Sequence, residues 1–107
     1  MSADRLGPVF SALSDPNRRY VVEALAERGD ATATELASEL PVTRQAVAKH
    51  LGALREAGLV EATRAGRETR YRLTPQPLGD AVSWIERVGD QWDARLAALR
   101  RAVRRPT

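Results

Sequence analysis

The feature that most constrains this chain is the run TRQAVAKHLGALREAG at residues 43–58. Thr43 suits a helix N-cap, because its hydroxyl can accept hydrogen bonds from the unpaired amides of the first turn, and Gly58 suits the position just past a helix end. Three apolar residues between them recur at the i, i+4, i+7 spacing of one helical face: Val47, Leu51 and Leu54. The run therefore predicts a helix of about four turns with one face on a core.

The opposite face of this helix is polar, basic and narrow, and it consists of Arg44, Gln45, Ala48, Lys49 and Gly52. Ala48 and Gly52 have little bulk, so the backbone can approach a surface closely. Arg44 and Gln45 lie in the first turn, where recognition helices usually meet base edges. Taken alone, the helix is equally well explained as a DNA-reading helix or as an ordinary amphipathic surface helix.

The segments before this helix predict three shorter helices. The first covers residues 5–13, and the second starts at Asp15-Pro16 and runs to about Glu27, with Gly29 as its stop. The third follows the capping-box pattern TATE at residues 32–35 and continues through Leu40. Pro41-Val42 alone separates it from the helix at Thr43, and two helices joined by so short a turn predict a helix-turn-helix.

After Gly58 the pattern changes from helical to alternating, which predicts a β-hairpin that turns near Gly66. An isolated hairpin is barely stable, so Tyr71 and Leu73 should lean on the helices. Arginines flank the tip and line the outer face: Arg64, Arg67, Arg70 and Arg72. Alone, this is the pattern of an edge strand protected by charge. Directly after a helix-turn-helix, it is better explained as a wing that grips the phosphate backbone.

Charge is distributed unevenly along the sequence. Residues 41–72 hold seven basic and three acidic side chains, a balance of +4, while the whole chain has a formal net charge of +3. All of the excess positive charge therefore lies in one contiguous third of the chain. A polyanion is the natural partner of such a patch, because neutralised phosphates release condensed counterions.

A long helix is predicted from about Leu78 to Val103, after the segment TPQP at residues 74–77 closes the hairpin. Its apolar positions follow alternating steps of four and three, with Gly89 in the one vacant position: Leu78, Val82, Ile85, Trp92, Leu96, Leu99 and Val103. Such a helix is nearly 40 Å long, more than the rest of a small domain can cover. We expect a second copy of the chain to cover it, rather than its own chain alone, and the first helix offers a further apolar stripe to the same interface.

Several segments, taken together and in order, resemble the ArsR-type winged helix-turn-helix repressors of prokaryotes. These are FSALSDPNRR, ATELASEL, TRQAVAKHL, LREAGLV and GRETRYRLT, and the likeness extends over the whole chain. The resemblance implies a mainly α fold with a small β-hairpin, in the order of four helices, the hairpin and a last helix. It also implies a homodimer joined through the first and last helices, a fourth helix in the major groove, and repression by blocking promoter access.

The resemblance carries specific roles onto this sequence. The groove-facing motif falls on Thr43, Arg44, Gln45, Ala48, Lys49 and His50, and the wing on Arg64, Gly66, Arg67 and Arg70. Thr32 matches a polar helix start whose amide end faces phosphate in the family. The first and last helices would supply the dimer contacts: Leu6, Phe10, Val82, Ile85, Trp92, Leu96 and Leu99.

Two departures from the family pattern affect what is expected. Pro41 stands where the turn often has glycine, and proline cannot adopt positive φ, so the turn should be shaped differently. The chain has no cysteine, which excludes the family's thiolate metal site. The terminal helix offers carboxylates but no histidine, and a carboxylate-only site is hard and weak toward zinc or nickel. We expect no regulatory metal and no cofactor.

His50 is the only histidine of the chain. A histidine changes charge near neutral pH and is an attractive pH switch. We favour the plainer account, in which His50 packs beneath the recognition helix or donates to one phosphate. Without cysteine, and with the serines scattered along the chain, it forms no nucleophile and base set, so no enzyme activity is expected.

Length and composition bound the remaining expectations. The 107 residues suffice for a single domain over residues 1–107, and neither a secretory signal nor a membrane span is present, so cytoplasm is the default.

Trp84 and Trp92 are either core residues of the dimer seam or the lining of a pocket for a small-molecule effector. The sequence favours a dimeric repressor of double-stranded operator DNA. The alternative is a winged-helix module that binds another protein and has an incidental basic wing.

Overall fold

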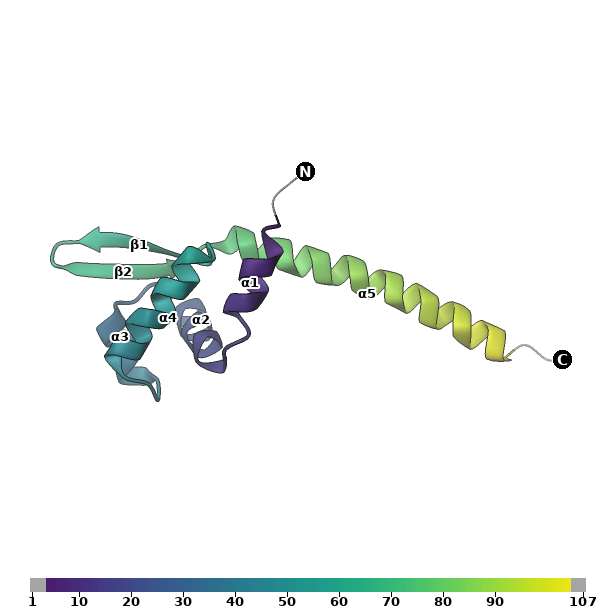
Figure 1. The fold of residues 1–107 in the computed structure, drawn as a ribbon, viewed down its shortest axis with the longest axis horizontal. Coiled ribbons are helices and arrows are strands. Elements are labelled where there is room, and N and C mark those ends of the chain that lie inside the picture. Colours follow the sequence, from purple (N-terminus) through teal and green to yellow (C-terminus); the bar gives the residue numbers. More distant parts are fainter. Residues whose placement is uncertain (1–3, 105–107) are drawn as a thin grey trace.

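The computed structural model describes residues 4–104, which form a helical head with a β-hairpin at one side and a long helix at the other (Figure 1). Within these residues the elements are α1 (Leu6–Ala12), α2 (Pro16–Arg28), α3 (Ala33–Glu39), α4 (Arg44–Glu56), β1 (Val60–Ala65), β2 (Glu68–Leu73) and α5 (Pro75–Arg104). The order is the one expected from the sequence. The fold is a winged helix-turn-helix.

Local capping explains where the helices of the head begin and end. The side chain of Asp15 accepts a hydrogen bond from the amide of Asn17 at 2.7 Å, and Gly29 ends α2 with a φ of 86°. Thr32 and Glu35 form the expected capping box at the start of α3. That helix ends at Glu39, one residue earlier than predicted. Leu40 is extended (φ −110°, ψ 151°) because it precedes a proline, which disfavours the helical region.

The core of the head is built from the apolar stripes of the helices and the first strand. Its buried members are Val9, Ala12, Val21, Leu25, Ala31, Leu36, Val47, Leu51, Leu54, Leu59, Val60 and Ala81. The predicted inner face of α4 is completely buried, with Val47, Leu51 and Leu54 all at 0% exposure. The opposite face of α4 therefore faces solvent.

The hairpin is antiparallel and pairs Val60 with Leu73 and Ala65 with Glu68. Gly66, which adopts a φ of 63°, provides the left-handed residue of the turn, as predicted. An isolated bridge between Ala31 and Tyr71 ties the second strand to the segment between α2 and α3. Tyr71 donates to the Ala31 carbonyl at 2.8 Å and accepts from the Ala31 amide at 3.0 Å. The hairpin is thus anchored at its base and free at its tip.

Helix α5 begins at Pro75, three residues before the predicted start at Leu78. The segment expected to close the hairpin is instead its first turn. A first helical turn tolerates Pro75 and Pro77, because the amides that proline lacks have no intrahelical partner there. The helix has 30 residues, and it gives the molecule extents of 73 × 35 × 19 Å. No helix of the described residues is long and apolar enough to cross a membrane.

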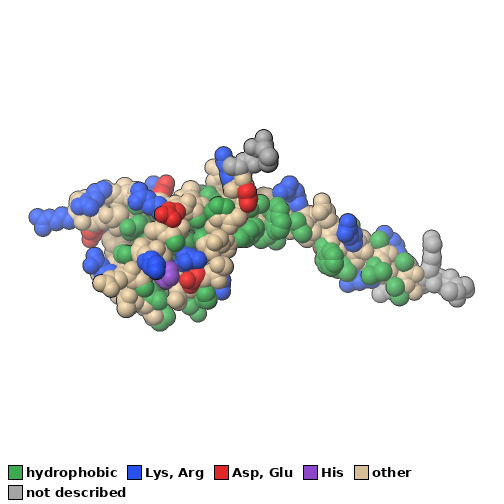
Figure 2. Space-filling view, viewed as in Figure 1, with side chains coloured by type: hydrophobic (Ala, Val, Ile, Leu, Met, Phe, Trp, Pro, Cys, Tyr) green, Lys and Arg blue, Asp and Glu red, His purple; other side chains and the backbone are tan. Residues whose placement is uncertain are grey.

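Most of the apolar stripe of α5 faces solvent in the single chain. Ala81 is buried, but Val82, Ile85, Trp92 and Leu99 are each more than half exposed. Figure 2 shows the resulting green patches along α5, beyond the head. Such a stripe on a projecting helix is typical of a surface that another polypeptide covers.

Candidate nucleic-acid interface

The outward face of α4 carries the residues expected to read DNA. The Thr43 hydroxyl accepts from the Ala46 amide at 3.1 Å and caps the helix. The side chains expected to face the groove are exposed: Arg44, Gln45, Ala48 and Lys49. Within residues 4–104, neither Arg44 nor Lys49 forms an ion pair. Both cations are therefore available to an incoming polyanion.

His50 lies at the border of this face and is half-buried. It is near the start of α2. There the Asn17 amide holds the pKa of the Asp15 carboxyl below its ordinary value, and the charges of Arg18 and His50 make smaller contributions in the same direction. His50 therefore lies at the edge of the helix, and its contact with a phosphate stays a prediction.

The tip of the wing is exposed and basic. The Nε atom of Arg64 donates to the Gly66 carbonyl at 3.1 Å, which orients this side chain along the turn. Arg67 is exposed at the turn itself. Basic side chains mark this end of the hairpin in Figure 2. Arg72, on β2, is paired with Glu61 of β1 at 2.7 Å.

Arg70 occupies a different environment from the one expected for a phosphate contact. Its Nη2 lies 3.1 Å from Asp30 and 3.2 Å from Glu35, and its Nη1 lies 3.1 Å from Glu68. The hydrogen bond with Asp30 and the neighbouring negative charges raise the pKa of Arg70 further above its ordinary value. Three carboxylates thus hold the guanidinium in the free chain, and a phosphate contact by Arg70 stays a prediction.

Thr32 starts α3 and forms the expected capping box with Glu35. Its hydroxyl accepts from the Glu35 amide at 3.1 Å, and its own amide donates to Glu35 Oε1 at 2.8 Å. The side chain of Glu35 therefore occupies the hydrogen-bonding position of the Thr32 amide. The structure assigns Thr32 a capping role. The capping-box pattern of the sequence predicts this role, and a phosphate near the start of α3 stays a prediction.

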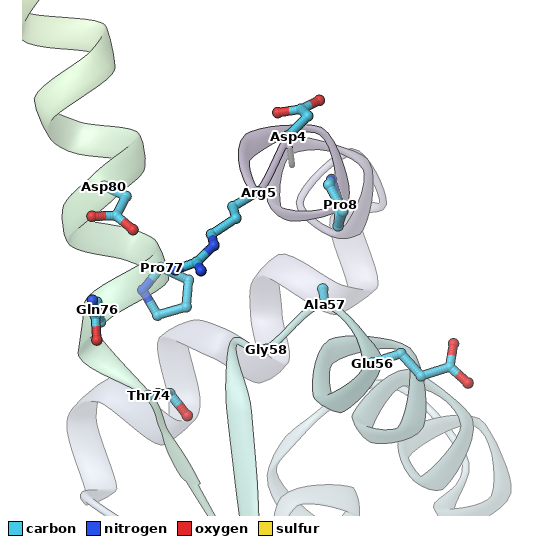
Figure 3. A pocket seen from close by; sticks show the side chains of 10 residues that line it. All are labelled: Asp4, Arg5, Pro8, Glu56, Ala57, Gly58, Thr74, Gln76, Pro77 and Asp80. Carbon is cyan, nitrogen blue, oxygen red and sulfur yellow. The ribbon is translucent and has the colours of Figure 1, made fainter. Parts of the chain in front are cut away.

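The two tryptophans of α5 lie in different surroundings in the single chain, and a shared effector pocket in the dimer stays a prediction. The Trp84 ring packs against Phe10 of α1, whereas Trp92 borders a separate depression of about 240 Å³ with Val88, Gln91 and Arg95. A cleft of about 350 Å³ lies where α1, the end of α4 and the start of α5 meet. Figure 3 shows Arg5 reaching across this cleft toward Pro77, with Asp80 on the wall formed by α5. No cluster of histidine and carboxylate side chains with the geometry to hold a metal occurs among the described residues.

A short turn between α3 and α4, an outward face on α4 and a basic hairpin after it define a winged helix-turn-helix protein of the DNA-binding class. Comparison with known proteins supports this class directly. The family pattern described as a helix-turn-helix domain matches residues 13–63. The transcriptional repressor SdpR of Bacillus subtilis (strain 168) is 32% identical, over 72% of this chain and 84% of that protein.

Similarity to solved structures identifies the family within this class. An ArsR-like transcriptional regulator from Rhodococcus sp. RHA1 has a TM-score of 0.79 and 44% identity, covering 96% of this chain and 95% of that chain. The homodimeric winged helix-turn-helix DNA-binding domain (fragment 1–100) of Mb0332 from Mycobacterium bovis has a TM-score of 0.66 and 26% identity, covering 82% of this chain and 81% of that chain. The protein belongs to the ArsR family of winged helix-turn-helix transcriptional regulators, as its sequence segments indicated.

Proposed function

We propose that the protein is a dimeric repressor that binds a two-fold symmetric operator, with one α4 helix in the major groove of each half-site. The observation that carries this proposal is the outward face of α4, where an arginine and a lysine stand without ion-pair partners among residues 4–104. The name of SdpR supports repression rather than activation. Repression follows physically if a bound dimer covers the promoter.

Each exposed residue of the interface has a role that its chemistry suggests. Arg44 and Gln45 read base edges, since arginine suits guanine and glutamine suits adenine. Ala48 lets the helix backbone approach the groove, and Gly66 shapes the wing turn. The remaining contacts position the protein on phosphates without reading sequence, and they come from Thr43, Lys49, Arg64 and Arg67, with His50 at the edge of the helix.

Dimerisation through α5 and α1 accounts for the exposed apolar stripe. The stripe is symmetric about the midpoint between residues 90 and 91. An antiparallel second copy therefore places Val82 opposite Leu99, Ile85 opposite Leu96, and Gly89 opposite Trp92 of the partner subunit. Nothing lies within 4 Å of the position that a Cβ on Gly89 would take, so the large indole of the partner has room there. Phe10 borders the same surface, and Leu6 of the same helix is partly buried against the core.

Charge favours the same antiparallel arrangement. Residues 75–93 carry four acidic side chains and one arginine, whereas residues 94–104 carry four arginines and no acid. An antiparallel pair brings the basic end of each helix beside the acidic half of the other, while a parallel pair aligns like charges. Such a dimer holds two α4 helices apart. Repression requires a separation of about 34–36 Å, one turn of B-DNA.

We further propose that this repressor does not respond to a transition metal. The chain has no cysteine, and its one histidine lies on α4, far along the chain from the carboxylates of α5. Soft and borderline metals prefer thiolate and imidazole ligands, which this arrangement does not bring together. A direct check is to measure operator affinity with and without zinc, nickel and a chelator. Release of the operator by either metal would contradict this part of the proposal.

The function is tested by selecting genomic fragments of the parent organism with the purified protein, followed by anisotropy titrations on the selected site at several salt concentrations. We expect one or a few promoter fragments that contain an inverted repeat, bound by two chains, with affinity that falls steeply with salt. A scrambled duplex of the same length is the control. If no duplex shows salt-dependent affinity and the chain pairs only with a different protein, the interaction-module alternative replaces this proposal.

A further inference from the structure

Beneath the wing, five charged side chains from four segments form one cluster, defined here as the wing-base cluster: Arg28, Asp30, Glu35, Glu68 and Arg70. Arg70 contacts all three carboxylates, and Arg28 also contacts Glu35 at 3.1 Å. The carboxylates come from the loop after α2, from α3 and from the hairpin itself. The cluster therefore spans the junction between the wing and the helix-turn-helix.

We propose that Arg70 is a positioning residue, which sets the angle of the wing relative to α3 and does not itself bind phosphate. This inference rests on the DNA-binding function proposed above and names the device that orients the wing. Its expected consequence is that the affinity for DNA depends on Asp30 and Glu35, two acids that repel the phosphate backbone. If neutralising these two acids weakens DNA binding, Arg70 positions the wing. If it tightens binding, Arg70 contacts phosphate directly.

The geometry around Arg70 is that of an anchor. Both terminal nitrogens are engaged, with Nη2 shared between Asp30 and Glu35 and Nη1 on Glu68. The side chain is 28% exposed, against 62% for Arg72 on the same strand. The next residue, Tyr71, is hydrogen-bonded through its backbone amide and carbonyl to Ala31. One guanidinium and one backbone bridge thus fix adjacent residues of β2 to the same loop.

Glu35 ties this anchor to α3. Its Oε1 accepts from Thr32 and from Arg70, and its Oε2 accepts from Arg28. The Thr32 amide is the largest cause that lowers the pKa of Glu35, and the charges of Arg70 and Arg28 add to it. The carboxylate that completes the capping box of α3 therefore also holds the wing. A rotation of the wing would have to break contacts at the start of α3.

Direct phosphate binding by Arg70 would leave the wing-base cluster without a central cation. Asp30, Glu35 and Glu68 would then face each other with Arg28 as the remaining positive charge, beside a polyanion. Arg64 and Arg67 at the tip contact none of these carboxylates within 4 Å in the described part of the chain. Arginines at the tip of the wing therefore contact phosphate, whereas Arg70 at its base orients the wing.

The decisive experiment measures operator affinity of the double variant Asp30→Asn, Glu35→Gln. Glutamine preserves the capping box of α3, so the helix start remains intact. If Arg70 positions the wing, loss of two of its three ion pairs weakens binding about two- to fivefold, although two negative charges have been removed. If Arg70 instead contacts phosphate, the same variant frees it and removes repulsion, so binding tightens. Tighter binding overturns the proposal.

A second measurement does not require DNA. Amide hydrogen exchange at Tyr71 should accelerate in Arg70→Ala and in the double variant, while exchange at the core residue Leu51 stays unchanged. Arg67→Ala is the matched control, because it removes an arginine of the same hairpin that anchors nothing, and it should leave Tyr71 protected. Unchanged exchange at Tyr71 in Arg70→Ala would reject the positioning role. Because this readout is independent of the operator, failure of the chain to bind DNA would count against the proposed function alone.

Salt dependence supplies a third readout on the operator. Arg70→Ala should weaken binding with an unchanged slope of log affinity against log salt, because it displaces no counterion from DNA. Arg67→Ala should reduce that slope by about 0.9. A reduction of the same size in Arg70→Ala would show a phosphate contact and overturn the proposal.

Discussion

The ring of Phe10 in α1 meets the ring of Trp84 in α5 edge to face, with the ring centroids 5.6 Å apart and the planes at 61°. Both side chains remain partly exposed, at 37% and 39%. This contact joins the start of the projecting helix to the head, and its exposed side is continuous with the apolar stripe of α5. One aromatic pair thus belongs both to the fold of the chain and to its proposed dimer surface.

Phe10→Ala should therefore weaken folding and dimerisation together. The edge-to-face pair contributes about 0.5–1.5 kcal/mol beyond the area it buries, so the unfolding midpoint in urea should fall. The dimer dissociation constant, measured by sedimentation, should rise. Phe10→Leu is the matched control, since it keeps apolar bulk and removes only the ring. An Ala variant with unchanged midpoint and unchanged dissociation constant would show that the pair stabilises neither.

Sequence patterns predicted the elements because α2, α3 and α4 each begin at a residue whose side chain caps the helix. The Thr32 capping box, the Asp15-Pro16 start and the Gly66 turn act over a few residues, so local chemistry determines them. The observed helix ends differ from the predicted ones where a proline is near the boundary. Leu40 lies outside α3 because proline follows it, and α5 begins before the predicted residue because Pro75 suits a first helical turn.

The arrangement of the site was predicted less completely, and Arg70 shows why. Alternation along β2 predicted that Arg70 lies on the opposite side of the strand from Tyr71 and Leu73, and nearby arginines suggested a phosphate contact. Its partners Asp30 and Glu35 are 40 and 35 residues away, and no local pattern reports which charges tertiary packing brings together. The outward residues of α4 needed only helical periodicity, so their exposure followed from the sequence.

Thr43 combines a cap with a proposed phosphate contact, and substitutions can separate the two. Thr43→Ala removes the hydroxyl that accepts from the Ala46 amide, and should cost about 1 kcal/mol of folding free energy. Thr43→Asp keeps a capping oxygen and preserves stability, but its negative charge should repel phosphate and weaken operator binding. Thermal unfolding and anisotropy measure the two effects. Binding by Thr43→Asp at full affinity would place Thr43 away from the backbone.

Arg44 and Arg67 should differ in how their loss affects specificity. Arg44→Ala should reduce discrimination between the operator and a mutated site by about 1–3 kcal/mol, because it removes a base contact. Arg67→Ala should weaken all sequences alike, because it removes a phosphate contact. The check is a salt titration of each variant on the operator and on a scrambled duplex. If neither substitution changes operator binding, the assignment of groove helix and wing is wrong.

Acid should loosen the wing base. The hydrogen bond from Arg70 holds the pKa of Asp30 below its ordinary 3.8, and the Thr32 amide holds that of Glu35 below its ordinary 4.5. Groups with lowered pKa values stabilise the fold above those ordinary values, and the contribution is lost as pH falls through the lower folded values. Exchange protection at Tyr71, corrected for intrinsic rates, should therefore decline below about pH 4.5. The variant Asp30→Asn, Glu35→Gln should lack this decline.

The antiparallel pairing of α5 can be tested with single cysteines, because the natural chain contains none. Val82 and Leu99 are 52% and 59% exposed in the single chain, and the proposed dimer places each opposite the other. A mixture of Val82→Cys and Leu99→Cys chains, exchanged and then oxidised, should yield a disulfide-linked dimer. Either variant alone should give little, because like positions lie at opposite ends of an antiparallel pair. Efficient cross-linking of Val82→Cys with itself would indicate parallel helices, and would require the charge argument for α5 to be abandoned.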